Sequence, residues 1–324
     1  MQYQSGDLST FSKQIGFAIK NYSPHGFQAA NLNGVIISGL GGSGIAGRIV
    51  QGVLQPVANM PVQVVSDYEL PAWADEKTLV IASSYSGNTE ETLYMFRNAM
   101  SKGCPSLVLS TGGELTRIAG DNNVQCYPAE TGFQPRMALG YSLTYLVCIF
   151  EELLGKKIFK NTGELIKKLA DIDRFKSRAG ELLGTIEDLN HKFVVISDRT
   201  TTAAGIRFCQ QIQENAKGEA FVTELPEANH NVIESYYGKM DSSFILLNGN
   251  AHERTSLRFK FIKDLLTQNG NKVCEINLDG NNIEELIDRI YVLDWLSLII
   301  ADKKGVNSVK IPNINNLKKY LSGN

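Results

Sequence analysis

The chain has 324 residues, of which 43% are hydrophobic and 20% charged, and this composition argues against an intrinsically disordered protein. Its net charge of −2, without a dense run of lysine and arginine, offers no electrostatic surface for DNA or RNA. No apolar run reaches the roughly 20 residues that span a bilayer, and the amino terminus lacks the pattern of a signal peptide.

The amino-terminal half alternates between helical segments and short apolar runs, after an opening helical segment that extends to about residue 30. Most of the runs are continuously apolar, which is typical of strands covered on both faces. Helices between them predict a parallel sheet with right-handed crossovers. The predicted strands are 34–38, 62–67, 78–84, 106–111 and 124–130, and a long apolar helix is predicted over 137–155.

The second half begins with a lysine-rich helical stretch, 156–184, that has no strand character. We therefore expect two domains, residues 1–155 and residues 156–324. The strands predicted in the second domain are 193–197, 219–225, 242–248 and 272–278, followed by a final long helix over 283–305.

The two halves resemble copies of one plan, because VIISGLGGSGIAGRIV (35–50) aligns with VVISDRTTTAAGIRFC (194–209). Each copy has a strand, a serine, a loop of small residues and the start of a helix. The fold class predicted is therefore α/β, with two tandem doubly wound domains whose parallel sheets are flanked by helices. Glycines of the first loop are threonines in the second, so the two loops are expected to differ in function.

The first loop, GLGGSGIAG (39–47), joins a strand to a helix, where glycines let backbone N–H groups approach an anion. The Gly-x-Gly-x-x-Gly match could also indicate a dinucleotide site, or only a tight turn. A serine in the turn suits a phosphate monoester better. Gly42 and Ser43 are therefore candidate phosphate ligands.

The second loop, SSYSGNTEET (83–92), also ends a strand and opens a helix. Its hydroxyls and the free N–H groups of the helix form a plausible phosphate site without any cation. The alternative is a simple N-cap with two glutamates in the first turn. Capping needs only one hydroxyl, so Ser84, Ser86 and Thr89 are candidate phosphate ligands.

These two loops resemble the sugar isomerase (SIS) domain. Three further segments, QPRMALGY (134–141), ENAK (214–217) and LPEANHN (225–231), resemble motifs of the bifunctional phosphoglucose/phosphomannose isomerase family, in the family's order. The resemblance implies a phosphosugar isomerase that interconverts glucose 6-phosphate, and mannose 6-phosphate, with fructose 6-phosphate through an enediol(ate). It also implies catalysis without a metal, and the sequence has no metal-binding motif or cofactor signature.

Such an isomerase needs a carboxylate base, a cation near the developing oxyanion and groups that open the sugar ring. Glu214 is the predicted base, and Arg136 the predicted cation. His230, in a polar turn, has an ordinary pKa near 6.5 that suits proton transfer to the ring oxygen. The alternatives are a solvated glutamate, a structural ion pair and a surface histidine.

The resemblance further implies a catalytic lysine near the carboxyl terminus, which Lys318 matches in an Ile-x-x-Leu-Lys pattern, although Lys319 adjoins it. The preceding GVNS (305–308) departs from the family's usual Gly-x-Asp-Pro, which leaves the preferred epimer open. The resemblance also implies a homodimer in which the turn with His230 reaches the neighbouring subunit's phosphate site. The long helices 137–155 and 283–305 are expected to supply apolar surface for it, unless they are buried between the domains.

Two other functions fit the same loops: a phosphosugar-binding regulator without chemistry, and an aminosugar- or pentose-phosphate isomerase. A regulator would not need Glu214, Arg136, His230 and Lys318 together. Five scattered cysteines without a Cys-x-x-Cys pair favour reduced thiols, so a cytoplasmic enzyme with a small-molecule phosphosugar substrate is predicted, without nucleic-acid or membrane partners.

Overall fold

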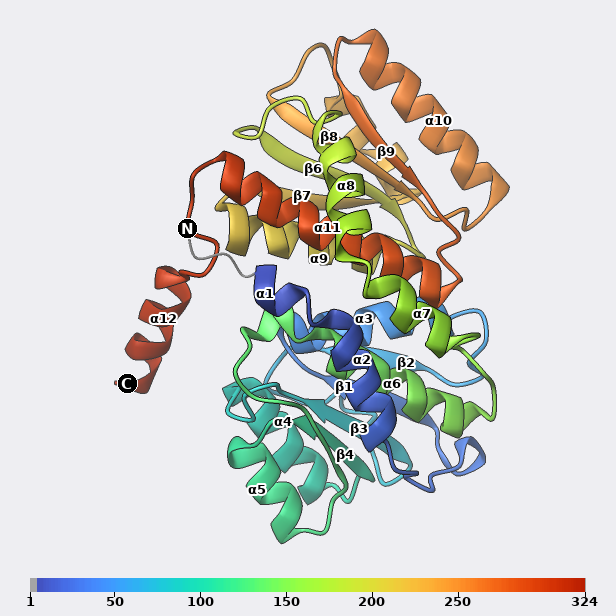
Figure 1. Ribbon diagram of the computed structural model, residues 1–324. Helices are drawn as coiled ribbons and strands as arrows, with labels where there is room; N and C mark the ends of the chain where they lie inside the picture. The colour runs from blue at the N-terminus through green and yellow to red at the C-terminus, as the bar shows by residue number, and fades with distance from the viewer. Residues whose placement is uncertain (1–4, 324) are drawn as a thin grey trace.

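The structure, a computed structural model, describes residues 5–323 (Figure 1). Residues 1–4 of the predicted first domain and residue 324 of the second lie outside this range. Two parallel sheets, each flanked by helices, follow one another along the chain, which confirms the predicted α/β fold of tandem doubly wound units. The domain boundary at residue 155 stays a prediction.

The first sheet has the strand order β2-β1-β3-β4-β5, with every neighbouring pair parallel. The order reverses between β1 and β3, and ligands of such sheets bind beyond the carboxyl ends of the strands at this point. The strands are β1 (Gly34–Ser38), β2 (Val62–Val65), β3 (Thr78–Ser83), β4 (Ser106–Ser110) and β5 (Cys126–Pro128).

The second sheet has the order β7-β6-β8-β9, which repeats the first four positions of the first sheet. The internal repeat read from the sequence therefore corresponds to a structural repeat. Its strands are β6 (Lys192–Asp198), β7 (Ala220–Leu225), β8 (Ser242–Asn248) and β9 (Val273–Asn277).

The strands β1, β3, β4 and β8 are buried along their whole length because both faces of each sheet are covered by helices. In β1, Val35 and Ile37 belong to the large core shared by the two domains, whereas Ile36 packs with the opposite helical layer. In β6, Val195 and Ile196 divide in the same way. Successive side chains of a strand point to opposite faces, so no polar alternation arises.

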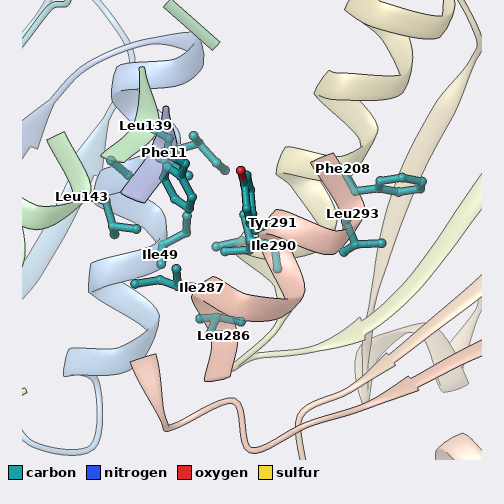
Figure 2. Packing of buried hydrophobic residues seen from close by; sticks show 14 of the residues in the cluster. Phe11, Ile49, Leu139, Leu143, Phe208, Leu286, Ile287, Ile290, Tyr291 and Leu293 are labelled. Atoms are coloured by element: carbon teal, nitrogen blue, oxygen red, sulfur yellow. The ribbon is translucent and has the colours of Figure 1, made fainter. Parts of the chain in front are cut away.

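One helical layer lies between the two sheets, and its side chains form a single hydrophobic core (Figures 1 and 2). Outer helices cover the far face of each sheet. The inner helices are α2 (Phe11–Asn21), α3 (Gly41–Leu54), α6 (Leu139–Leu154), α7 (Thr162–Leu169), α8 (Ile172–Leu183), α9 (Thr202–Gln211) and α11 (Ile283–Lys303), and the outer ones are α4 (Glu90–Ser101), α5 (Gly113–Asp121) and α10 (Glu253–Gln268).

The long helices α6 and α11 do not provide the free apolar surface that we expected for a partner subunit. Phe150 of α6 and Ile290 of α11, for example, are at most 1% exposed and lie in the core between the sheets. The prediction that these helices supply a dimer surface is wrong, and the alternative, burial within one chain, is confirmed.

The carboxyl-terminal helix α12 (Pro312–Ser322) stands away from the two domains (Figure 1). Every residue from Pro312 to Leu321 is exposed, including Leu317 and Tyr320. At the other end, the short helix α1 (Ser5–Leu8) lies against α11. None of the helices in residues 5–323 is long and apolar enough to cross a bilayer.

Candidate active site

The two predicted phosphate loops meet at the carboxyl edge of the first sheet. The Tyr85 N–H donates to Ser43 Oγ at 3.2 Å, and this bond joins the loop after β3 to the start of α3. Ser84 Oγ and Thr89 Oγ1 lie 2.8 Å apart, and Ser86 Oγ accepts from the Asn88 N–H at 3.3 Å. The structure thus brings the two loops into contact and pairs Ser84 with Thr89 within the second loop.

Neither helix that begins at these loops is capped by a side chain. Leu40 is the N-cap residue of α3 and Thr89 that of α4, and neither makes a side-chain capping bond. The capping alternative for the second loop therefore lacks its side-chain bond, although Thr89 is the N-cap residue and Glu90 and Glu91 lie in the first turn. Two uncapped helix ends present N–H groups and positive dipole ends at one place, which is an arrangement that favours an anion.

Gly42 brings the first loop against the segment that carries Arg136. A Cβ on Gly42 would lie 2.6 Å from the Pro135 carbonyl oxygen and 3.2 Å from the Arg136 Cα, so no side chain fits there. Arg136 lies in the short 3₁₀ helix η2 (Pro135–Met137), and a small cavity beside this helix is lined by Gly42, Ser43 and Tyr141 among others. The phosphate loops and the predicted cation are therefore adjacent.

Arg136 and Glu214 form an ion pair across the two domains, with Nη1 and Oε2 3.0 Å apart. The Arg136 side chain is 5% exposed and that of Glu214 28%, so the carboxylate faces the solvent side of the pair. Arg136 Nε donates to Asn215 Oδ1 at 2.9 Å, and Nη2 donates to the Ser308 carbonyl at 2.7 Å. Three of the five guanidinium N–H groups thus donate within residues 5–323, and the other two make no hydrogen bond there.

Glu214 lies in a π-helical turn, η3 (Ile212–Ala216), that continues α9. Such turns are frequent at functional sites. Burial lowers the pKa of the Arg136 guanidinium, and the Glu214 carboxylate opposes this shift. A buried cation held beside a half-exposed carboxylate can stabilise negative charge that develops on a bound substrate.

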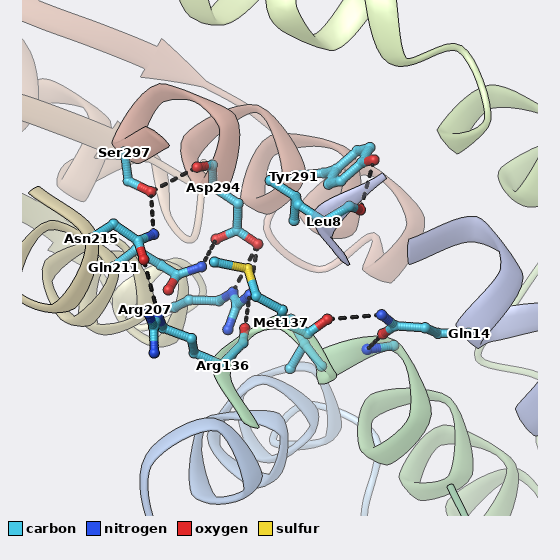
Figure 3. Close-up of polar contacts among 12 residues, drawn as sticks. Leu8, Gln14, Arg136, Met137, Arg207, Gln211, Asn215, Tyr291, Asp294 and Ser297 are labelled. Carbon is cyan, nitrogen blue, oxygen red and sulfur yellow. Dashed lines mark hydrogen bonds and ion pairs between the residues drawn. The ribbon is translucent and has the colours of Figure 1, made fainter. Parts of the chain in front are cut away.

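A buried polar network holds the backbone and side chain of Arg136 on the side of α9 and α11 (Figure 3). Arg207 donates to the Arg136 carbonyl at 3.0 Å and pairs with Asp294 at 2.6 Å. Burial raises the pKa of the Asp294 carboxyl, and the Arg207 charge opposes this shift. This pair was not predicted from the sequence. The available signal was a charged residue on the buried face of both α9 and α11.

Lys217 connects the carboxyl-terminal segment to the predicted base. Its ammonium donates to the Glu214 carbonyl and, at 2.6 Å, to the Lys310 carbonyl. Burial and the nearby Arg136 charge lower the pKa of Lys217. Together with the Arg136 bond to Ser308, this contact holds the segment just before α12 beside the site.

The other two predicted catalytic residues do not bond to this pair within the described residues. His230 is exposed at the end of η4 (Glu227–His230), and Lys318 is exposed on α12. Within residues 5–323, neither forms a hydrogen bond or ion pair with Arg136 or Glu214. Their catalytic roles stay predictions.

In the second domain, the counterpart of the phosphate loop is filled by a carboxylate. Asp198 has no exposed surface, and its oxygens accept from the N–H groups of Thr200 at 2.9 Å and Gly249 at 2.8 Å. A Cβ on Gly249 or Gly280 would lie about 2 Å from Thr200 Oγ1, so the loop is closely packed. The expectation that the two loops differ agrees with this geometry.

No group of three or more His, Cys, Asp or Glu side chains is placed to hold a metal ion within residues 5–323. Whether catalysis is metal-free stays a prediction.

The family model of the bacterial phospho-glucose isomerase C-terminal SIS domain matches residues 175–321, so the tandem fold with its paired loops is of the SIS type. The bifunctional phosphoglucose/phosphomannose isomerase of Caldicellulosiruptor bescii is 33% identical over 309 residues, 91% of this chain and 91% of that protein. The chain belongs to the bifunctional phosphoglucose/phosphomannose isomerase family, as its motifs predicted.

Two other similarities say less about the function of this chain. The D-glucosamine-6-phosphate 4-epimerase of Sulfolobus acidocaldarius is 33% identical over 208 residues, which cover 64% of this chain and 65% of that protein. The glucosamine-6-phosphate deaminase of Thermotoga maritima superposes with a TM-score of 0.71 at 14% identity, with 95% of each chain covered. The latter similarity supports the fold alone.

Proposed function

We propose that the protein interconverts glucose 6-phosphate, and mannose 6-phosphate, with fructose 6-phosphate through an enediolate. The observation that carries this proposal is the Arg136–Glu214 pair beside two uncapped helix ends that carry hydroxyls. A regulator without chemistry would need the phosphate loops but not this pair.

In the proposed mechanism, the loops with Ser43, Ser84 and Thr89 hold the phosphate. Glu214 moves a proton between C1 and C2, and the two remaining N–H groups of Arg136 face the oxygen on which charge develops. His230 would serve ring opening, and Lys318 would be the carboxyl-terminal catalytic lysine. Neither bonds to the Arg136–Glu214 pair within one chain, so both would come from another copy or move toward the site.

A coupled assay with fructose 6-phosphate, mannose 6-phosphate and glucosamine 6-phosphate tests this function. We expect turnover of the first two substrates, unchanged after treatment with EDTA. Turnover of glucosamine 6-phosphate alone would instead favour an aminosugar-phosphate enzyme, the second candidate, to which the similarity with the 4-epimerase points. No turnover of any substrate would contradict the proposal.

The phosphate loops are tested by replacing Ser84 and Thr89 together with alanine. A hydrogen bond to a charged group is worth about 1.5–3 kcal/mol, so KM is expected to rise at least about 10-fold while kcat changes little. The matched control is the hydroxyl pair Ser197–Thr202, 3.0 Å apart in the second domain, whose alanine variant should keep KM. Unchanged KM in the Ser84/Thr89 variant would remove the assignment.

We also propose a cytoplasmic homodimer with shared active sites. The five cysteines are free thiols, which suits a reducing compartment. Apolar side chains are exposed on α12, where Leu317 is 57% exposed and Tyr320 69%, and Tyr237, seven residues after His230, is 90% exposed. Exposed apolar side chains at both places support a second copy that covers them.

Subunit complementation tests the shared site. An inactive His230→Ala variant, mixed and re-equilibrated with inactive Glu214→Gln, is expected to regain up to about a quarter of wild-type activity if subunits mix statistically. The control mixes Arg136→Lys with Glu214→Gln. Because these residues pair within one chain, this mixture should regain nothing. An active monomer, or no recovery after verified subunit exchange, would contradict the shared site.

A further inference from the structure

Asn215 follows the proposed base in the Glu-Asn-Ala-Lys segment, and the proposed function gives it no role. We propose that Asn215 is a positioning residue which, with Ser297, fixes the plane of the Arg136 guanidinium. Arg136 then turns its two remaining N–H groups toward the substrate. This inference rests on the proposed function and deepens it.

The first step is the contact between Asn215 and Arg136. Asn215 has no exposed surface, and its Oδ1 accepts from Arg136 Nε at 2.9 Å. The guanidinium is planar, so acceptors at Nε and at Nη2, the latter the Ser308 carbonyl, together fix its position and its plane. Without Asn215, the bonds to Glu214 at Nη1 and to Ser308 at Nη2 remain, but the Nε edge of the plane loses its acceptor.

The second step is the orientation of the Asn215 amide. Its Nδ2 donates to Ser297 Oγ at 2.9 Å, and Ser297 Oγ donates to the Asp294 carbonyl at 2.7 Å. Ser297 is fully buried, so water does not replace a lost bond. If the amide were turned over, its NH₂ group would face the Arg136 N–H. The chain of donors from Asn215 to Asp294 therefore keeps the amide oxygen toward Arg136.

The third step is that residues of one helix, α11, hold both the backbone and the side chain of Arg136 in place. Ser297 and Asp294 lie one turn apart on α11 (Figure 3). Asp294 pairs with Arg207, which donates to the Arg136 backbone carbonyl, while Ser297 acts on the guanidinium through Asn215. The backbone and the side chain of the cation are thus both held by the helix at the centre of the shared core.

The test compares Asn215→Ala, Ser297→Ala and the double variant with wild type. We expect kcat to fall about 10- to 100-fold in Asn215→Ala and about 3- to 10-fold in Ser297→Ala, with KM within about twofold. The double variant should be no slower than Asn215→Ala, because Ser297 acts only through Asn215. Asn271→Ala is the matched control: Asn271 is 4% exposed, makes three hydrogen bonds in the second domain and lies in none of the site's contacts. It should lower Tm but keep kcat.

A second measurement does not depend on activity. In protein with ¹⁵N-labelled arginine, the Arg136 Nε–H should exchange with solvent at least about 10-fold faster in Asn215→Ala, while the Arg207 Nε–H, bonded to Asp294 at 3.1 Å, should not change. Three outcomes would overturn the inference. They are multiplicative kcat losses in the double variant, a kcat for Asn215→Ala equal to that of Asn271→Ala, and an unchanged exchange rate of the Arg136 Nε–H. An inactive wild type with the expected exchange pattern would contradict the proposed function only.

Discussion

Replacing Glu214 by glutamine is expected to lower kcat by about 100-fold or more while phosphosugar binding survives. The amide keeps the shape of the side chain, and its oxygen can still accept from Arg136 Nη1, which now lies 3.0 Å from the carboxylate. What is lost is the base that moves the proton between C1 and C2. The measurement is kcat and KM for fructose 6-phosphate, with Tm as a check on folding.

Glu275→Gln is the matched control for this variant. Glu275 pairs with Lys263 at 2.6 Å in the second domain, and its side chain is 24% exposed, close to the 28% of Glu214. It should cost a little stability and no activity. Near-wild-type turnover of Glu214→Gln would reject Glu214 as the base. In wild type, solvent deuterium at C2 of the aldose product would support proton transfer through the protein.

The sheets were predictable from the sequence because most strands are apolar on both faces. The run 34–38 corresponds to Gly34–Ser38, and 242–248 to Ser242–Asn248. The helix predicted over 283–305 is Ile283–Lys303. The edge strand β5 was predicted too long, as 124–130 instead of Cys126–Pro128, because it pairs with only one neighbour and its burial is partial.

Site residues were predictable from the sequence only where they belong to a local sequence motif. The two loops, Arg136 and Glu214 could each be selected from the sequence. That they lie next to one another could not, because it depends on how one domain packs against the other. Asn215 could not be given a role, because its partner Ser297 is 82 residues away and lies inside an apolar helix. The exposure of α12 could not be predicted either, because apolar residues at helical spacing usually indicate a buried helix face.

The second large effect is expected from Arg136→Lys, which keeps the charge but loses the planar fork. The guanidinium donates to Asn215, Glu214 and Ser308 and still has two N–H groups left, whereas an ammonium has three donors in all on a shorter reach. Loss of a donor that stabilises a developing oxyanion costs about 10²–10³ in kcat. We expect a fall of this size, with KM for the phosphosugar changed little because the phosphate loops are untouched.

Two comparisons separate this loss from simple destabilisation. Arg174→Lys alters an arginine of the second domain that pairs with the buried Asp288 at 2.9 Å, and should leave kcat unchanged. In Arg136→Ala, guanidinium added to the solution should restore part of kcat, since the missing group is a cation with N–H donors and the surrounding acceptors remain. If Arg136→Lys folds and turns over within about threefold of wild type, the enediolate is stabilised by another group, and the ion pair with Glu214 only holds the two domains together.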